Sequence, residues 1–98
     1  MVKHVILWTL KEEINDKDAV KIAAKEALEA LVEKIDGLVS LKVNIEPMAS
    51  SNVDMMLDSE FVSQEALCSY AKHPEHVAVA DTYVRPYTAT RSCMDYEI

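Results

Sequence analysis

The 98 residues are enough for one domain with a single modest core, so we expect residues 1–98 to form one domain. Half of the residues are hydrophobic and 28% are charged, which is typical of a globular protein and excludes a disordered one. The net charge of −7 argues against nucleic acid as a partner, because binding phosphates requires clustered Lys and Arg, and the ten basic residues here are scattered.

The sequence also argues against a membrane partner. No apolar run approaches the roughly 20 residues that cross a bilayer, and the first residues, Met1–His4, have no signal-peptide pattern. We therefore expect a cytoplasmic protein. Cys68 and Cys93 do not have the spacing of metal ligands, and we expect both to be reduced, partly buried thiols.

Residues 2–11 have the alternation of a strand and are apolar on both faces, as in a strand that is covered on two sides. One face carries Val2, His4, Ile6, Trp8 and Leu10, and the other carries Lys3, Val5, Leu7, Thr9 and Lys11. A helical period follows from Asn15 or Asp16 to Asp36, with Asp16 or Asp18 as its cap. Gly37, the only glycine, is expected to end this helix at positive φ.

The second half of the chain predicts two strands, two helices and a last strand. Residues 39–46 alternate strictly, with Val39, Leu41, Val43 and Ile45 inward, and a polar turn at 47–52 leads to a strand at 53–62. Ser63 caps a helix that ends at about Lys72, and Pro74 begins a second short helix to about Thr82. The last strand covers 88–98, with Arg91, Cys93 and Asp95 on one face.

This order of elements predicts a ferredoxin-like α+β fold, βαββαβ, with a four-stranded antiparallel sheet and the helices on one face. The other face still carries Val5 and Leu7, or Ile6 and Trp8. A bare apolar patch of this kind is typical of an interface, and a two-fold axis would cover it with a second copy. We therefore predict a homodimer in which two sheets form an α/β barrel; the alternative is a monomer whose long side chains and tail shield the patch.

Several segments together resemble the stress-responsive A/B-barrel (Dabb) family over the whole chain. They are Val2–Trp8 (VKHVILW), Ile35–Ser40 (IDGLVS), Asp58–Leu67 (DSEFVSQEAL), Tyr70–His76 (YAKHPEH) and Asp95–Glu97 (DYE). The resemblance implies a homodimeric barrel, and it implies little about chemistry because many members have no assigned activity. One plant branch, the olivetolic acid cyclases, closes a polyketide by aldol condensation, and its motif residues correspond to His76 as the base, Tyr70 and His4.

The residues themselves suggest a polar site on otherwise apolar surfaces. His73 and His76 lie three residues apart across Pro74, Tyr70 lies on the preceding helix, and His4 interrupts an apolar strand face. A histidine can act as a general base near neutral pH, and a tyrosine hydroxyl can orient a carbonyl. The structural alternative is that His73 caps a helix and His4 is a hydrogen-bonded core residue.

The sequence predicts no cofactor and no metal site. The pair His73 and His76 with Asp81 lacks a third ligand at a suitable spacing, although carboxylates near an interface could hold magnesium weakly. Arg91 and Asp95 are expected to form a solvated or interface pair.

Three functional hypotheses follow. The first is a homodimer that binds a small apolar molecule between sheet and helices, with His4, Tyr70, His73 and His76 at its polar end. The second is a cofactor-independent enzyme (a polyketide cyclase, isomerase or monooxygenase-like protein) with His76 as the general base, and the third is a structural or protective oligomer without a ligand. The sequence leaves open whether any reaction is catalysed.

Overall fold

Strand β1 (Val2–Leu10) lies in the middle of a four-stranded antiparallel sheet in the computed structural model, which describes residues 1–98. It pairs on one side with β3 (Met55–Phe61) and on the other with the edge strand β4 (Thr88–Glu97). Strand β2 (Leu38–Asn44) forms the other edge, which gives the order β2-β3-β1-β4. The ferredoxin-like βαββαβ fold predicted from the sequence is therefore confirmed.

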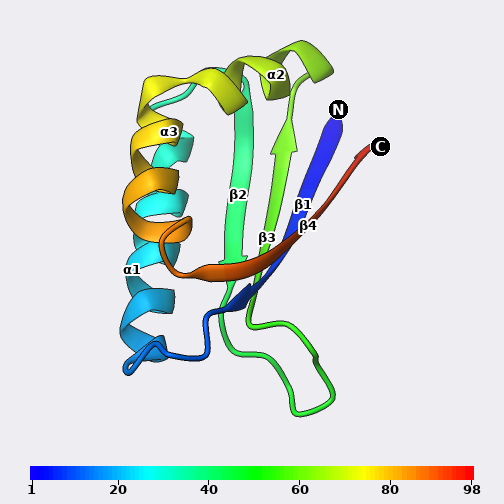
Figure 1. Ribbon diagram of the computed structural model, residues 1–98. Coiled ribbons are helices and arrows are strands. Elements are labelled where there is room, and N and C mark those ends of the chain that lie inside the picture. Colours follow the sequence, from blue (N-terminus) through cyan, green and yellow to red (C-terminus); the bar gives the residue numbers. More distant parts are fainter.

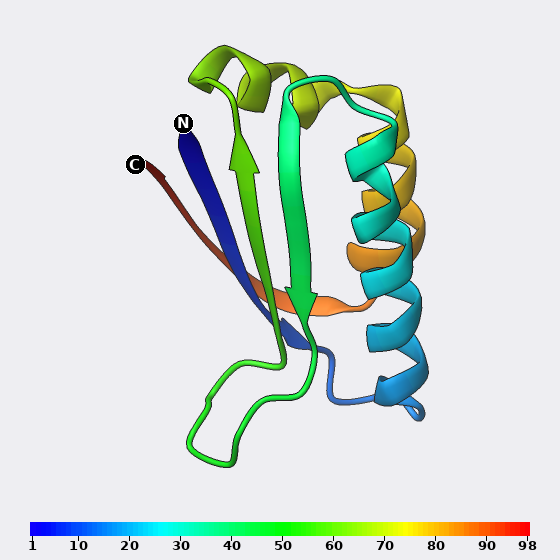
Figure 2. The same ribbon diagram turned by 180° about the vertical axis from the view of Figure 1, so that it is seen from behind.

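The helices all lie on one face of this sheet (Figures 1 and 2). Helix α1 (Lys17–Glu29) continues into a 3-10 turn (Ala30–Glu33), and α2 (Gln64–Lys72) is followed by α3 (Pro74–Val79) and a π-helical turn (Ala80–Val84). None of these helices has the length and apolar composition that crossing a membrane requires.

The predicted helix starts are correct, and polar side chains explain them. The Asp16 carboxylate accepts a hydrogen bond from the Ala19 amide at 3.0 Å, and the Ser63 hydroxyl accepts one from the Ala66 amide at 3.1 Å. Each bond satisfies an amide that has no partner within its own helix. Gly37 has a φ of +86°, as expected for the residue that turns the chain from α1 toward β2.

Several predicted boundaries are wrong. The α-helix expected to reach Asp36 ends at Glu29 and tightens into the 3-10 turn, and the helix that Pro74 begins widens into a π-helical turn at Ala80. Val39 was expected to point inward but is exposed, because the pairing of β2 with β3 shifts between Leu38 and Ser40 and turns Leu38 into the core instead.

The two faces of the sheet differ in what covers them. On β1, the residues at even positions from Val2 to Leu10 are buried toward the helices, and the intervening residues are only half-buried on the open face. Every residue of β4 after Thr88 is exposed, including Arg91, Cys93 and Asp95, which pair with the buried Trp8, Ile6 and His4. The helices therefore leave a gap over β4, on the side where the candidate site lies.

Candidate functional site

A cavity of about 610 Å³ lies between the sheet and the helices. Of its 21 lining residues 13 are hydrophobic, among them Ile6 and Trp8 from β1, Leu67 from α2 and Val84 from the π-helical turn. Since clefts that bind small molecules usually have volumes of about 300–1,000 Å³ and mostly apolar walls, this cavity is of the right size and composition to hold one.

His4 is the polar residue at the floor of the cavity, and the sheet fixes its position. It is one of only two buried polar residues, and the other, Ser59, donates its hydroxyl to the His4 carbonyl at 2.8 Å across the β1–β3 pair. The Nδ1 atom of His4 is in direct hydrogen-bond contact with Asp95, which lies opposite it on β4. A carboxylate can only accept, so Nδ1 carries the proton and Nε2 of a neutral ring is the free base.

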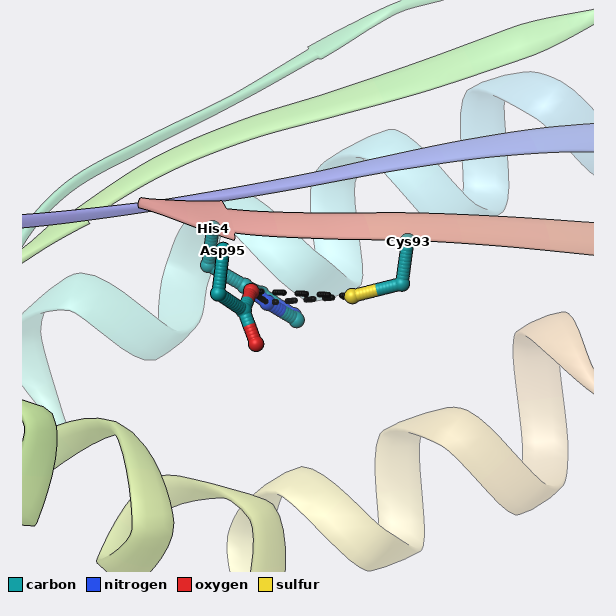
Figure 3. A group of neighbouring side chains, drawn as sticks. All are labelled: His4, Cys93 and Asp95. Atoms are coloured by element: carbon teal, nitrogen blue, oxygen red, sulfur yellow. Dashed lines mark hydrogen bonds and ion pairs between the residues drawn. The ribbon is translucent and has the colours of Figure 1, made fainter. Parts of the chain in front are cut away.

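Cys93 lies two residues before Asp95 on β4 and contacts both His4 and Asp95. Its Sγ lies 3.7 Å from His4 Nδ1 and 3.5 Å from the Asp95 carboxylate. Figure 3 shows the three side chains leaving β1 and β4 on the side of the sheet that faces the helices. Partial desolvation of the thiol, followed by the nearby Asp95 carboxylate, raises the pKa of Cys93, which favours the protonated form.

Tyr70 and His76 form the opposite wall, on the helical side. Their ring centroids lie 4.1 Å apart with an interplanar angle of 33°, and the Tyr70 ring is also 6.3 Å from the His4 ring. Burial raises the pKa of the Tyr70 hydroxyl, so this group stays a hydrogen-bond donor at neutral pH. Burial also lowers the pKa of His76. His76 Nδ1 faces the Ala71 carbonyl at 3.4 Å, which leaves Nε2 as the free base of a neutral ring.

The structure thus brings three of the four predicted site residues together: His4, Tyr70 and His76 all line the cavity. His73 is not among the lining residues. Its Nδ1 accepts a hydrogen bond from the Glu75 amide at 3.1 Å, so it caps α3 in the way that the structural alternative described. Asp81, weighed as a partner for a metal with the two histidines, instead forms an ion pair with Arg85.

Sequence reasoning missed the contribution of β4. Asp95 was expected to pair with Arg91, but its carboxylate contacts His4, and no ion pair joins it to Arg91. Cys68 and Cys93 were expected to be reduced, partly buried thiols; both are free, as expected, but they are exposed. The alternation of β4 correctly placed Arg91, Cys93 and Asp95 on one face, and only the pairing of β4 with β1 reveals that this face lines the cavity.

The comparison with protein families agrees with this geometry. Residues 2–98 match the model of the stress responsive A/B barrel domain, Dabb. The chain belongs to the Dabb family. A comparison of this Dabb chain with curated proteins finds no match.

Solved structures show the same fold. A dimeric ferredoxin-like protein of unknown function from Bacteroides fragilis has 32% sequence identity and a TM-score of 0.90, over 99% of this Dabb chain and 95% of that one. A protein from Arabidopsis thaliana has 22% identity and a TM-score of 0.82, over 100% and 95% of the two chains. The hydroxynitrile lyase of Passiflora edulis has 16% identity and a TM-score of 0.74, over 99% and 92%.

Proposed function

We propose that this Dabb protein is a homodimer that binds a small, largely apolar molecule in the cavity between sheet and helices. The observation that carries the proposal is the cavity itself, about 610 Å³ with 13 hydrophobic residues among the 21 that line it. Neither the packing of the core nor the capping of the helices requires such a space. The cytoplasmic location remains a prediction.

The polar groups of the cavity favour a ligand with an oxygen-bearing end. The Tyr70 hydroxyl is a donor at neutral pH, and the Nε2 atoms of His4 and His76 are acceptors when both rings are neutral. Arg91 of β4 adds a cation to the lining of the cavity. A carbonyl, hydroxyl or carboxylate could be held at this end while the rest of the molecule contacts the apolar wall; His73 is left out because it does not line the cavity.

The open face of the sheet supports the homodimer. Val5 and Leu7 of β1 lie on the face away from the helices, next to Met56 of β3 and Met94 of β4. Met94 is 66% exposed, and exposed apolar side chains that gather on one face are typical of an interface. The Bacteroides fragilis relative, at 32% identity, is described as dimeric.

A second candidate function is cofactor-independent proton transfer with His76 as the general base. It is favoured by the pairing of a neutral imidazole with a tyrosine donor whose ring centroid lies 4.1 Å away, since a base must be unprotonated to accept a proton. The Passiflora edulis lyase shares the fold alone at 16% identity. A direct test is cyanide release from mandelonitrile by the wild type and His76→Gln; equal rates would contradict a catalytic role of His76 in that reaction.

Binding can be tested with Trp8, the only tryptophan of the chain, because it lines the cavity. Anilinonaphthalene sulfonate, an apolar molecule with an anionic end, absorbs where tryptophan emits and is a suitable probe. We expect saturable quenching of Trp8 fluorescence, and we expect Ala71→Phe to weaken it by about tenfold or more, because a phenyl ring on this cavity-lining residue of α2 would occupy the space.

Ala78→Phe is the matched control, since Ala78 is also an exposed helical alanine but does not line the cavity. It should leave the quenching unchanged. Equal loss in both variants, or no saturable quenching in the wild type, would contradict the proposed site and favour an oligomer without a ligand.

A further inference from the structure

His4, Cys93 and Asp95 bring three different metal-ligating atoms to one point in the wall of the cavity. The imidazole nitrogen, the thiol sulfur and a carboxylate oxygen all lie within 4.8 Å of one another (Figure 3). Two of the ligand atoms come from β4 and one from β1, and the antiparallel register sets their separation, since His4 lies opposite Asp95 and Ile6 lies opposite Cys93. Strand pairing therefore pre-organises this arrangement better than a loop would.

Two of the three distances between the ligand atoms fit a tetrahedral centre. With zinc bonds of about 2.3 Å to sulfur and about 2.0–2.1 Å to nitrogen and oxygen, the ligand atoms of a tetrahedral site lie about 3.3–3.6 Å apart. Cys93 Sγ lies 3.7 Å from His4 Nδ1 and 3.5 Å from the Asp95 carboxylate. His4 and Asp95 are closer than this because a proton now joins them, and the exposed Asp95 side chain is free to turn as that proton leaves.

The same geometry argues against a nucleophilic thiol activated by histidine. In a Cys-His-Asp relay the thiol contacts one ring nitrogen and the carboxylate contacts the other. Here both groups approach the same atom, Nδ1 of His4. Three ligand atoms that converge on a common point suit a cation at that point and do not suit proton transfer along a chain.

From this convergence we propose that His4 Nδ1, Cys93 Sγ and Asp95 Oδ1 form a binding site for a divalent transition metal ion, with Zn²⁺ the best fit. A nitrogen, sulfur and oxygen ligand set favours zinc over magnesium or calcium, which prefer oxygen ligands alone. One thiolate and one carboxylate balance the charge of the ion. Three protein ligands leave the fourth position open, and this position faces the cavity, where water or a ligand oxygen can bind.

The proposal does not depend on an organic ligand and can be tested on the metal-free protein. Titration with Co²⁺, a spectroscopic substitute for zinc, should produce a thiolate-to-cobalt charge-transfer band that saturates at one ion per protomer and disappears when Zn²⁺ is added. Cys93→Ser should abolish the band. Asp95→Asn should lower the affinity by at least about tenfold, the size of effect that even outer-shell partners of a metal have.

Two control variants are available in the same cavity. Cys68→Ser removes the other free cysteine, and Glu97→Gln removes the next carboxylate on the same face of β4; both should bind Co²⁺ as the wild type does. Because Cys93, Asp95, Cys68 and Glu97 are all exposed, these variants should fold. Absence of the band in the wild type, or a band that survives in Cys93→Ser, would overturn the proposal.

Discussion

At the scale of single residues, the protonation of His76 makes the stability of the fold depend on pH. Burial lowers its pKa below the ordinary value of 6.5, and the nearby side chains of Arg85, His4 and Arg91 act in the same direction. The hydrogen bond to the Ala71 carbonyl raises the pKa and opposes them. The unfolded chain takes up a proton at this residue near pH 6.5, whereas the folded protein does so only at a lower pH. Between the two pKa values the unfolded state binds more protons, so the free energy of unfolding decreases as the pH falls.

We therefore expect the wild type to lose stability between pH 7 and pH 5 more steeply than His76→Gln does. Urea unfolding at several pH values measures this difference, and subtracting the two profiles removes the contribution of the carboxylates. His73→Asn is the control, because it keeps a side-chain acceptor at the cap of α3 and leaves the cavity intact. Parallel profiles for wild type and His76→Gln would contradict the assignment.

Residue patterns predicted the candidate site only in part. A histidine on an apolar strand face and the spacing of Tyr70 and His76 both indicated a polar site, and the structure brings these three residues together. Cys93 and Asp95 were not predicted as members, because their environment depends on pairing between residues 91 positions apart, such as His4 and Asp95. Spacing along one strand predicts which residues share a face of that strand. It does not predict which other element packs against that face.

At the scale of elements, Gly37 lets the turn before β2 pass close to α2. Its φ of +86° disfavours any other residue, and a Cβ atom at this position would lie 2.7 Å from the Cβ of Ala66 in α2. The Gly37 carbonyl also accepts the Val62 amide at 2.9 Å. We expect Gly37→Ala to lower the free energy of unfolding by about 1–3 kcal/mol through backbone strain and this close contact.

Urea unfolding of the variant, combined with Ala66→Gly, separates the two causes. Ala66→Gly alone should cost about 0.5–1 kcal/mol, because glycine is unfavourable within a helix. In the Ala66→Gly background, however, Gly37→Ala should cost less than in the wild type, because the contact with the Ala66 methyl group is gone. Additive effects would show that the backbone alone carries the penalty.

Element boundaries were harder to predict than element types. Caps with side-chain acceptors, such as Asp16 and Ser63, were identified because a local hydrogen bond defines them. The position of Val39 was not, since the irregularity between Leu38 and Ser40 arises from pairing with Phe61 and Glu60 on another strand. A strict alternation predicts a regular strand, and a shift in register reverses the faces of every residue before it.

At the scale of the whole molecule, the sheet is covered on one face by helices and open on the other (Figures 1 and 2). The alternation of residues 2–11 predicted this imbalance, because the strand is apolar on both faces and the helices can cover only one side of the sheet. The cavity and the open face lie on opposite sides of the same strands. Substitutions on β1 can therefore be directed separately at the proposed dimer interface and at the proposed ligand site.

Leu7→Glu should convert the dimer to a monomer. Leu7 lies opposite Met56 and Ser92 on the open face, and a two-fold interface contacts itself, so one substitution introduces a carboxylate from each protomer into the same apolar patch. Ile22→Glu is the control, because Ile22 is half exposed on α1, away from that face. Native mass spectrometry should give a dimer for the wild type and Ile22→Glu and a monomer for Leu7→Glu.

A dimeric Leu7→Glu would show that another surface pairs the protomers. If the monomer still shows saturable quenching of Trp8 by the probe, then the cavity is complete within one chain; if quenching is lost, the partner contributes to it.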